Sequence, residues 1–520
     1  MDLLIKLPMV ILFFGVMIAI GIYCKKQATS VDGFVLGGRS VGPWLTAFAY
    51  GTSYFSAVVF VGYAGQFGWK YGIAATWAGI GNALIGSLMA WAILGRRTRI
   101  MTQHLGSATM PQFFQKRFDS SGLKLAASAI IFVFLIPYTA SLYNGLSRLF
   151  GMAFDIDYSV CVIIMAVITA IYVIVGGYMA TAINDFIQGI VMIVGIIAVI
   201  AAVLNGQGGF MESLNKLGQV CDPTVSDIPG VFNSFLGPDP VNLLGVVILT
   251  SLGTWGLPQM VQKFYAIKSE KAISKGMIIS TIFALVVAGG CYFLGGFGRL
   301  FAGRVDVAKD GYDSIIPAML SDLSPFLISV VVILVLSASM STLSSLVLTS
   351  SSTLTLDFIK GTLVKKMSEK RQLLIIRLLI VVFILISVVL ALVQYNSNVT
   401  FIAQLMGISW GALAGAFLAP FLFGLYWKKT TKAAVWVSFL FSTVVMVSNI
   451  FFGKYFPTIL RTPINAGVFC MFAGLVLVPV VSLFTKKPNT AHIQEVFSCY
   501  DRTVTVNVTD SIGTAKEENE

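Results

Sequence analysis

The chain has 520 residues, of which 57% are hydrophobic and 11% are charged, and its net charge is +12. Soluble domains average roughly 45–50% hydrophobic and about 25% charged residues, so this composition excludes an ordinary soluble protein. The basic residues are scattered among short loops and form no single patch, which argues against nucleic-acid binding.

Apolar segments of about 18–25 residues recur along the chain. A segment of this length crosses a bilayer as an α-helix, because a helix satisfies its backbone hydrogen bonds internally. The short alternating segments of barrel strands do not occur. The pattern predicts an all-α, polytopic membrane protein with about thirteen spans, near residues 4–24, 41–66, 72–94, 123–150, 158–176, 180–204, 242–264, 273–298, 323–358, 373–395, 400–426, 432–451 and 463–484.

The distribution of Lys and Arg predicts the orientation of these spans. The first apolar segment lacks an Ala-x-Ala cleavage pattern and runs directly into Lys25 and Lys26, so we interpret it as a retained helix. With the N-terminus outside, the inner loops, to which we assign Lys263, hold more than twice as many basic residues as the outer loops. We therefore expect a plasma-membrane protein with a polar cytoplasmic tail at 485–520.

Two spans contain polar, glycine-rich islands that favour a break in the helix. The second span contains Ala49 to Ser56, and the seventh contains Thr250 to Gln259. Glycine lowers helix stability and proline removes a backbone donor. Each broken span begins a block of five, at 41–204 and 242–395. Because five is odd, the second block starts from the opposite side of the membrane, which predicts an inverted repeat within a transport domain at 1–484.

The ninth span is rich in hydroxyl groups between Ser337 and Ser345. Ala338, Ser341, Thr342 and Ser345 share one helical face, and oxygen ligands suit a small hard cation such as sodium. Asp185 begins another apolar span, where an acid is costly unless it faces a cavity, pairs with another charge or binds a cation. The alternatives are hydroxyls bonded to their own helix and an interfacial helix cap.

Enzyme signatures are absent from the sequence. No Walker loop, Gly-x-Ser-x-Gly elbow or zinc pattern occurs, and the six cysteines share no pairing or metal-ligand spacing. We therefore expect neither an enzyme nor a nucleotide-driven pump.

Five motifs together resemble the sodium:solute symporter family, and the resemblance runs through nearly all of 1–484. They are Asp32 to Gly42, Gly176-Gly177-Tyr178 leading to Asp185 and Gln188, Gly256 to Gln259, Met340 to Ser344, and Trp410 to Gly415. The resemblance implies the family's inverted five-plus-five fold (LeuT-like), with one helix before the repeats, two after them, and two discontinuous helices.

The resemblance also implies two sodium sites. The shared site would use the carbonyls of Thr52, Phe55 and Ala338 and the hydroxyls of Ser341 and Thr342. Some members hold a second sodium ion with residues matching Asp185, Ser341, Ser344 and Ser345.

The residues matching the family's solute pocket are Tyr54, Ser56, Tyr138 and Thr254, with Trp255 close by. Tyr54 stands where sodium/proline carriers have an aspartate, and the stretches at Lys70 and Gly208 are closer to the pantothenate branch. We expect sodium-coupled uptake of a small organic solute, an amino acid such as proline or a carboxylate such as pantothenate, by alternating access. The alternatives are a proton-coupled symporter and a membrane solute sensor.

Overall fold

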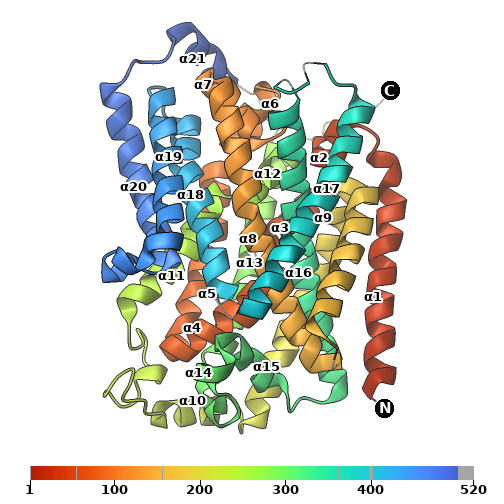
Figure 1. Ribbon diagram of the computed structural model, residues 1–520, viewed down its shortest axis with the longest axis vertical. Helices are drawn as coiled ribbons and strands as arrows, with labels where there is room; N and C mark the ends of the chain where they lie inside the picture. Colours follow the sequence, from red (N-terminus) through yellow and green to blue (C-terminus); the bar gives the residue numbers. More distant parts are fainter. Residues whose placement is uncertain are drawn as a thin grey trace, which may run out of the picture.

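A computed structural model describes residues 2–53, 55–154, 156–360, 362–364, 366–397 and 402–501. Within these ranges the protein is helical, with isolated bridges and no β-strand. Long helices run along the molecule's long axis, and short helices lie at both ends (Figure 1). The longer helices and broken-span halves are α1 (Asp2–Cys24), α3 (Pro43–Thr52), α4 (Ala64–Tyr71), α5 (Thr76–Gly81), α8 (Ser121–Phe154), α9 (Tyr158–Gly206), α11 (Pro240–Leu252), α12 (Pro258–Ala266), α13 (Glu270–Gly295), α16 (Pro325–Thr353), α17 (Glu369–Ser397), α18 (Ile402–Tyr426), α19 (Lys432–Phe452) and α20 (Pro463–Phe484). The short helices are α2 (Val31–Leu36), α6 (Arg96–His104), α7 (Met110–Phe118), α10 (Phe210–Gln219), α14 (Val307–Asp310), α15 (Ile315–Leu320) and α21 (Thr490–Phe497).

The helices confirm the predicted all-α, multi-spanning class. Ten described helical segments are long and apolar enough to cross a membrane, or up to eleven if α11 and α12 count as one bent span. α9 alone has 49 residues and is interrupted at Gly177, where φ is 57°. A straight helix of that length would measure about 74 Å, more than twice the roughly 30 Å hydrocarbon core. The interruption falls between the predicted spans 158–176 and 180–204, and the count of thirteen spans stays a prediction.

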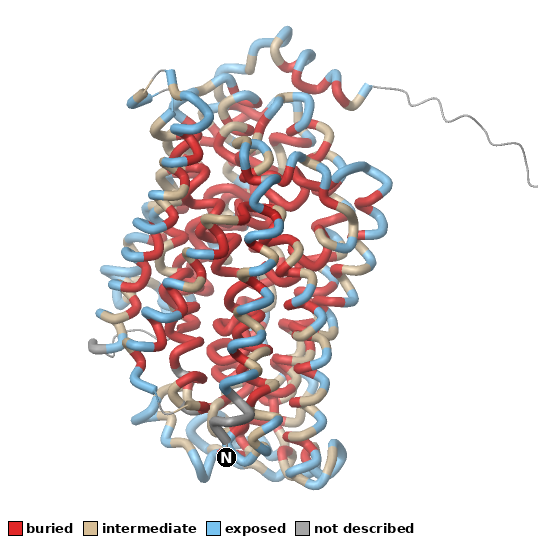
Figure 2. The backbone as a smooth tube through the Cα atoms, turned by 90° about the vertical axis from the view of Figure 1, so that its right-hand side faces the viewer, coloured by how far each residue is buried: buried red, intermediate tan, exposed pale blue. Residues whose placement is uncertain are grey.

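Apolar side chains cover much of the outer surface of the helices. Leu12 on α1, Val194 on α9 and Val389 on α17 are all exposed. Exposed positions lie along the outer sides of the molecule, and buried positions fill its interior (Figure 2). Such extensive apolar exposure is typical of a surface that contacts lipid.

The interior is built around α16 and α18. Every residue from 334 to 353 on α16 is buried, although many are serines and threonines. α18 is buried over most of its length and packs against α8 and α20. Small residues let neighbouring backbones approach each other: a Cβ atom added at Gly68 on α4 would lie 1.9 Å from the carbonyl oxygen of Gly295 on α13.

Both predicted islands interrupt their helices, as expected. α3 ends at Thr52, and the chain resumes as a π-helical stretch at Val58–Tyr63. α11 continues into a 3₁₀ turn at Gly253–Gly256, after which Leu257 is extended and α12 leaves at an angle of 47°. The carbonyls beside such a break lose their intrahelical donors and become available to other groups.

Part of the predicted tail is folded. α21 and the turn at Ser498–Tyr500 pack against α6. The Arg97 guanidinium lies 4.1 Å from the ring centroid of Tyr426 and 4.6 Å from that of Tyr500. The C-terminal turn is therefore held against α6 and the end of α18.

Candidate ion and solute site

The end of α3 faces the hydroxyl-rich face of α16. The Thr342 hydroxyl lies 3.0 Å from the Thr52 carbonyl oxygen, 3.2 Å from that of Phe55 and 3.1 Å from that of Ala338. The Ser341 hydroxyl lies 3.2 Å from the Thr52 oxygen and 3.0 Å from the Ala338 oxygen. The structure thus brings together all five residues predicted for the first sodium site, and all five are buried.

This cluster has more short oxygen–oxygen contacts than hydroxyl protons that could form hydrogen bonds across them. Two hydroxyls supply two protons, because each hydroxyl donates once, whereas five oxygen–oxygen distances are 3.2 Å or less. Hydrogen bonds therefore satisfy at most two of the five contacts. A small cation among the five oxygens would turn the remaining contacts into ligation, which is the chemistry that hard cations favour.

Neighbouring hydroxyls on α16 hold the interrupted chain in place. Ser339 accepts a hydrogen bond of 3.2 Å from the backbone amide of Ala57, just beyond the break. The Ser345 and Ser53 hydroxyls lie 3.0 Å apart. These contacts fix the first break against α16 and so position the carbonyls of Thr52 and Phe55.

Of the residues predicted for a second sodium site, Ser344 and Ser345 lie about one helical turn beyond Ser341 on α16, and Asp185 lies on α9. Asp185 is fully buried and lies more than two turns after the interruption at Gly177. Asp185 is therefore an interior residue of α9, and the alternative that it caps a helix at the membrane interface is wrong. Ser344 donates to the carbonyl oxygen of Ser341 at 2.9 Å.

The basic residue beside Asp185 is Lys263 on α12. Its Nζ atom lies 3.8 Å from Asp185 Oδ2 and donates to Ser345 Oγ at 3.0 Å. Our assignment of Lys263 to an inner loop is therefore wrong, because its side chain is only 3% exposed. Hydropathy misplaces it because α12 is the short second half of a broken span, enclosed by protein on all sides.

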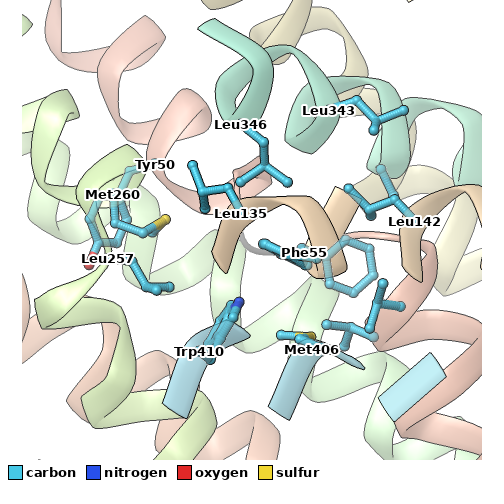
Figure 3. Packing of buried hydrophobic residues seen from close by; sticks show 14 of the residues in the cluster. Tyr50, Phe55, Leu135, Leu142, Leu257, Met260, Leu343, Leu346, Met406 and Trp410 are labelled. Atoms are coloured by element: carbon cyan, nitrogen blue, oxygen red, sulfur yellow. The ribbon is translucent and has the colours of Figure 1, made fainter. Parts of the chain in front are cut away.

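The predicted solute residues separate into two groups. Tyr138 on α8 lies near Ser56 and meets Trp410 on α18 edge to face, with ring centroids 5.9 Å apart. The Tyr138 hydroxyl faces the side chains of Ser56 and Trp410, but neither it nor Trp410 Nε1 makes a hydrogen bond of good geometry among the described residues. Figure 3 shows Trp410 in the packed interior, in the same cluster as Phe55. Such polar tips on apolar rings suit the wall of a solute site.

The side chains of Thr254 and Trp255 form hydrogen bonds with backbone carbonyl groups of a neighbouring helical stretch. The Thr254 hydroxyl lies 3.1 Å from the Gly86 carbonyl oxygen and 2.8 Å from that of Ser251, and Trp255 Nε1 donates to the Ile85 carbonyl oxygen at 3.0 Å. These contacts anchor the second break to the π-helical stretch at Asn82–Met89. Tyr54, the remaining predicted solute residue, lies outside the described residues.

Sequence reasoning did not include Trp410 among the site residues. Its place in a glycine-rich motif was visible, but its contact with Tyr138 depends on how α8 and α18 pack. Trp410 also lies near the second break, because a Cβ atom added at Gly253 would be 3.5 Å from its ring. It therefore joins the predicted solute residue Tyr138 to the second discontinuous helix.

Comparisons with known proteins agree on one kind of molecule. Residues 34–442 match the model of the sodium:solute symporter family. Sodium/proline symporters of Staphylococcus aureus strains JH9 and NCTC 8325 are 31% identical over 495 residues, covering 92% of this chain and 93% of theirs.

Solved structures show the same fold. A Na+-coupled sialic acid symporter in its substrate-bound outward-open state superposes with a TM-score of 0.74 at 16% identity, covering 93% of this chain and 99% of that one. Mhp1, a nucleobase-cation-symport-1 family transporter, gives a TM-score of 0.51 at 13% identity, covering 89% of this chain and 97% of its own.

Proposed function

Because this chain belongs to the sodium:solute symporter family, we propose that it binds sodium with Thr52, Phe55, Ala338, Ser341 and Thr342 and imports a small organic solute by alternating access. The observation that carries the proposal is a buried cluster of five oxygens, in which the carbonyl oxygens of Thr52, Phe55 and Ala338 each lie within 3.2 Å of the Thr342 hydroxyl, and two of them also lie within 3.2 Å of the Ser341 hydroxyl. Like its relatives, the protein is a transporter and not an enzyme.

We infer that the ion and the solute are coupled through the first broken helix. Thr52 and Phe55 would hold sodium on one side of the break, while Ser56 lies near Tyr138. Sodium would draw the carbonyls of the break together and so order the chain that carries Ser56. A solute bound against Tyr138 and Trp410 would then favour the same arrangement, which is the reciprocal coupling that symport requires.

Proline is the solute to test first. The sodium/proline symporters of S. aureus support this choice through their 31% identity across most of both chains. The apolar rings of Tyr138 and Trp410 each carry one donor that makes no hydrogen bond of good geometry, and they suit a small solute with an apolar body and an acceptor group. A carboxylate such as pantothenate shares these features, and it is the second solute to test.

The topology that goes with this function has thirteen spans, with inverted repeats near 41–204 and 242–395 and an external N-terminus in the plasma membrane. Figure 1 places α21, the last described helix, at the opposite end of the molecule from the start of α1, which supports an odd number of crossings between them. A polar hollow of about 500 Å³, lined by Lys70, Asp239 and Arg299 among others, would then face outward as an entrance.

The deciding experiment is uptake into proteoliposomes with sodium and proton gradients imposed separately. We expect labelled proline, or another member of a panel of amino acids and carboxylates, to accumulate only with an inward sodium gradient. Accumulation driven by a pH gradient without sodium would favour proton coupling. Specific solute binding without any accumulation would favour a sensor.

A further inference from the structure

Lys263 is a buried charge that the sodium site described above does not use. It lies in the middle of α12, every residue of which is buried. Lysine is almost never fully buried unless it is paired, because an isolated ammonium loses its hydration. A buried lysine beside the candidate ion site therefore needs an explanation.

Two helices, α9 and α16, supply partners for the Lys263 ammonium. It donates to Ser345 on α16 at 3.0 Å, lies 3.8 Å from Asp185 Oδ2 on α9, and stands 5.1 Å from the ring centroid of Tyr178. The two Asp185 oxygens have no hydrogen-bond partner among the described residues. The ammonium therefore provides the positive charge that this carboxylate faces.

Asp185 and Ser345 are two of the four residues that the family resemblance implies for a second sodium ion. We propose that the Lys263 ammonium is a tethered cation that takes the place of this second ion, so that the protein binds a single exchangeable sodium. This inference rests on the proposed function, because it assumes that sodium binds beside Thr342.

The hydrogen bonds of the four assigned ligands support this substitution. Ser345 Oγ accepts a hydrogen bond from Lys263 and forms a second hydrogen bond with the Ser53 hydroxyl. Ser344 donates to its own helix, as membrane-buried serines commonly do. Ser341 belongs to the first oxygen cluster. Asp185 is then the one assigned ligand with free lone pairs, and it already faces the ammonium.

The local charge balance leads to the same conclusion. One aspartate neutralises one buried cation, and Asp185 faces Lys263. A sodium ion bound to the same carboxylate would leave a surplus positive charge away from water, beside a second cation at the first site. Uncompensated buried charge is strongly unfavourable.

A tethered cation also differs from sodium because it is not transported. Lys263 is carried by α12, the second half of the second broken helix, so it cannot be released into the cytoplasm. Through Ser345 and Ser53 it reaches the end of α3, next to Thr52. It can thus hold the two broken helices together without drawing energy from a second sodium gradient.

The test counts sodium ions and needs no knowledge of the solute. Equilibrium binding of radioactive sodium to the purified full-length protein should give one ion per chain, and Thr342→Ala should remove it. Lys263→Ala should open the second place and raise the count to two. Lys263→Arg, which keeps the charge, and Lys268→Ala, which removes an exposed lysine five residues away, should both stay at one.

Asp185→Asn provides a test that does not depend on the folding of Lys263→Ala. A second sodium ion held by Asp185 predicts that this change lowers the count from two to one, whereas a tethered Lys263 predicts one ion before and after. Two ions in the wild type, or one in a folded Lys263→Ala variant, would overturn the proposal. A wild type that binds no sodium would contradict the proposed function instead.

Discussion

At the scale of single residues, Thr342 is the centre of the proposed sodium site. Its hydroxyl lies within 3.2 Å of three carbonyl oxygens, whereas the Ser341 hydroxyl approaches two. The sequence predicted this face from the spacing of hydroxyls along one helix. It could not predict Lys263 as a partner of Asp185, because that pairing depends on the packing of α9 against α12 and α16.

Thr342→Ala should raise the sodium concentration for half-maximal uptake at least tenfold, a loss of about 1.4 kcal/mol. The alanine removes the one ligand that contacts all three carbonyls. Thr342→Ser is the matched control, because it keeps the hydroxyl and removes only a methyl group, and it should remain within about twofold of wild type. Sodium titrations of initial uptake rates measure both, and equal sodium dependence in all three proteins would contradict the assignment.

Tyr138→Phe tests the solute wall. The Tyr138 hydroxyl is buried and faces Ser56 and Trp410 without a hydrogen bond of good geometry among the described residues, so removing it should change the thermal midpoint only slightly. A solute acceptor bonded to that hydroxyl would lose about 1 kcal/mol, or roughly a fivefold rise in KM for the solute. The measurement is uptake against solute concentration at saturating sodium. A rise in the sodium requirement with no change for the solute would place Tyr138 on the ion side.

At the scale of elements, breaks in the helices determine the architecture. The glycine and proline content of both islands predicted where the helices stop, and α3 and α11 end at Thr52 and Leu252, inside those islands. The conformation of the breaks was not predictable, because it depends on the partners in other helices that receive the freed groups. The bend of 47° before α12 is an example.

Gly177→Ala should lower the thermal midpoint of the purified protein by several degrees. Gly177 has φ 57° and ψ −155°, a conformation open almost only to glycine, at about 1–3 kcal/mol for other residues. A Cβ atom there would also lie 3.0 Å from the Phe34 carbonyl oxygen. Gly206→Ala on the same helix is the control, because nothing lies within 4 Å of its added Cβ. Equal midpoints for the two variants would show that the break tolerates a side chain.

At the scale of the whole molecule, hydropathy and charge predicted a bundle of spans with one basic end. The sequence could not predict that α21 would dock, because eight residues in a polar tail give a weak amphipathic signal. Phe497 is nevertheless buried beside Arg117, whose guanidinium carbon lies 4.9 Å from the ring centroid. The basic end therefore includes cations that hold the C-terminal turn.

The orientation of the bundle can be tested with a native cysteine. Cys221 follows α10 and is exposed, whereas Cys24, Cys161, Cys291, Cys470 and Cys499 are buried. α10 lies at the same end of the molecule as the marked N-terminus (Figure 1). If that end faces outward, as the positive-inside rule predicts, a membrane-impermeant maleimide should label Cys221 on intact cells. Cys221→Ser should abolish the labelling.

A reporter at the other end makes this test two-sided. Lys487 follows α20 at the basic end and is exposed, so Lys487→Cys in the Cys221→Ser background should react only after the cells are permeabilised. Labelling of Cys221 in intact cells together with protection of position 487 requires an odd number of crossings between them, in agreement with the seven predicted spans that separate these positions. The reverse pattern would invert the bundle, and the 500 Å³ hollow near Lys70 would then be an exit to the cytoplasm.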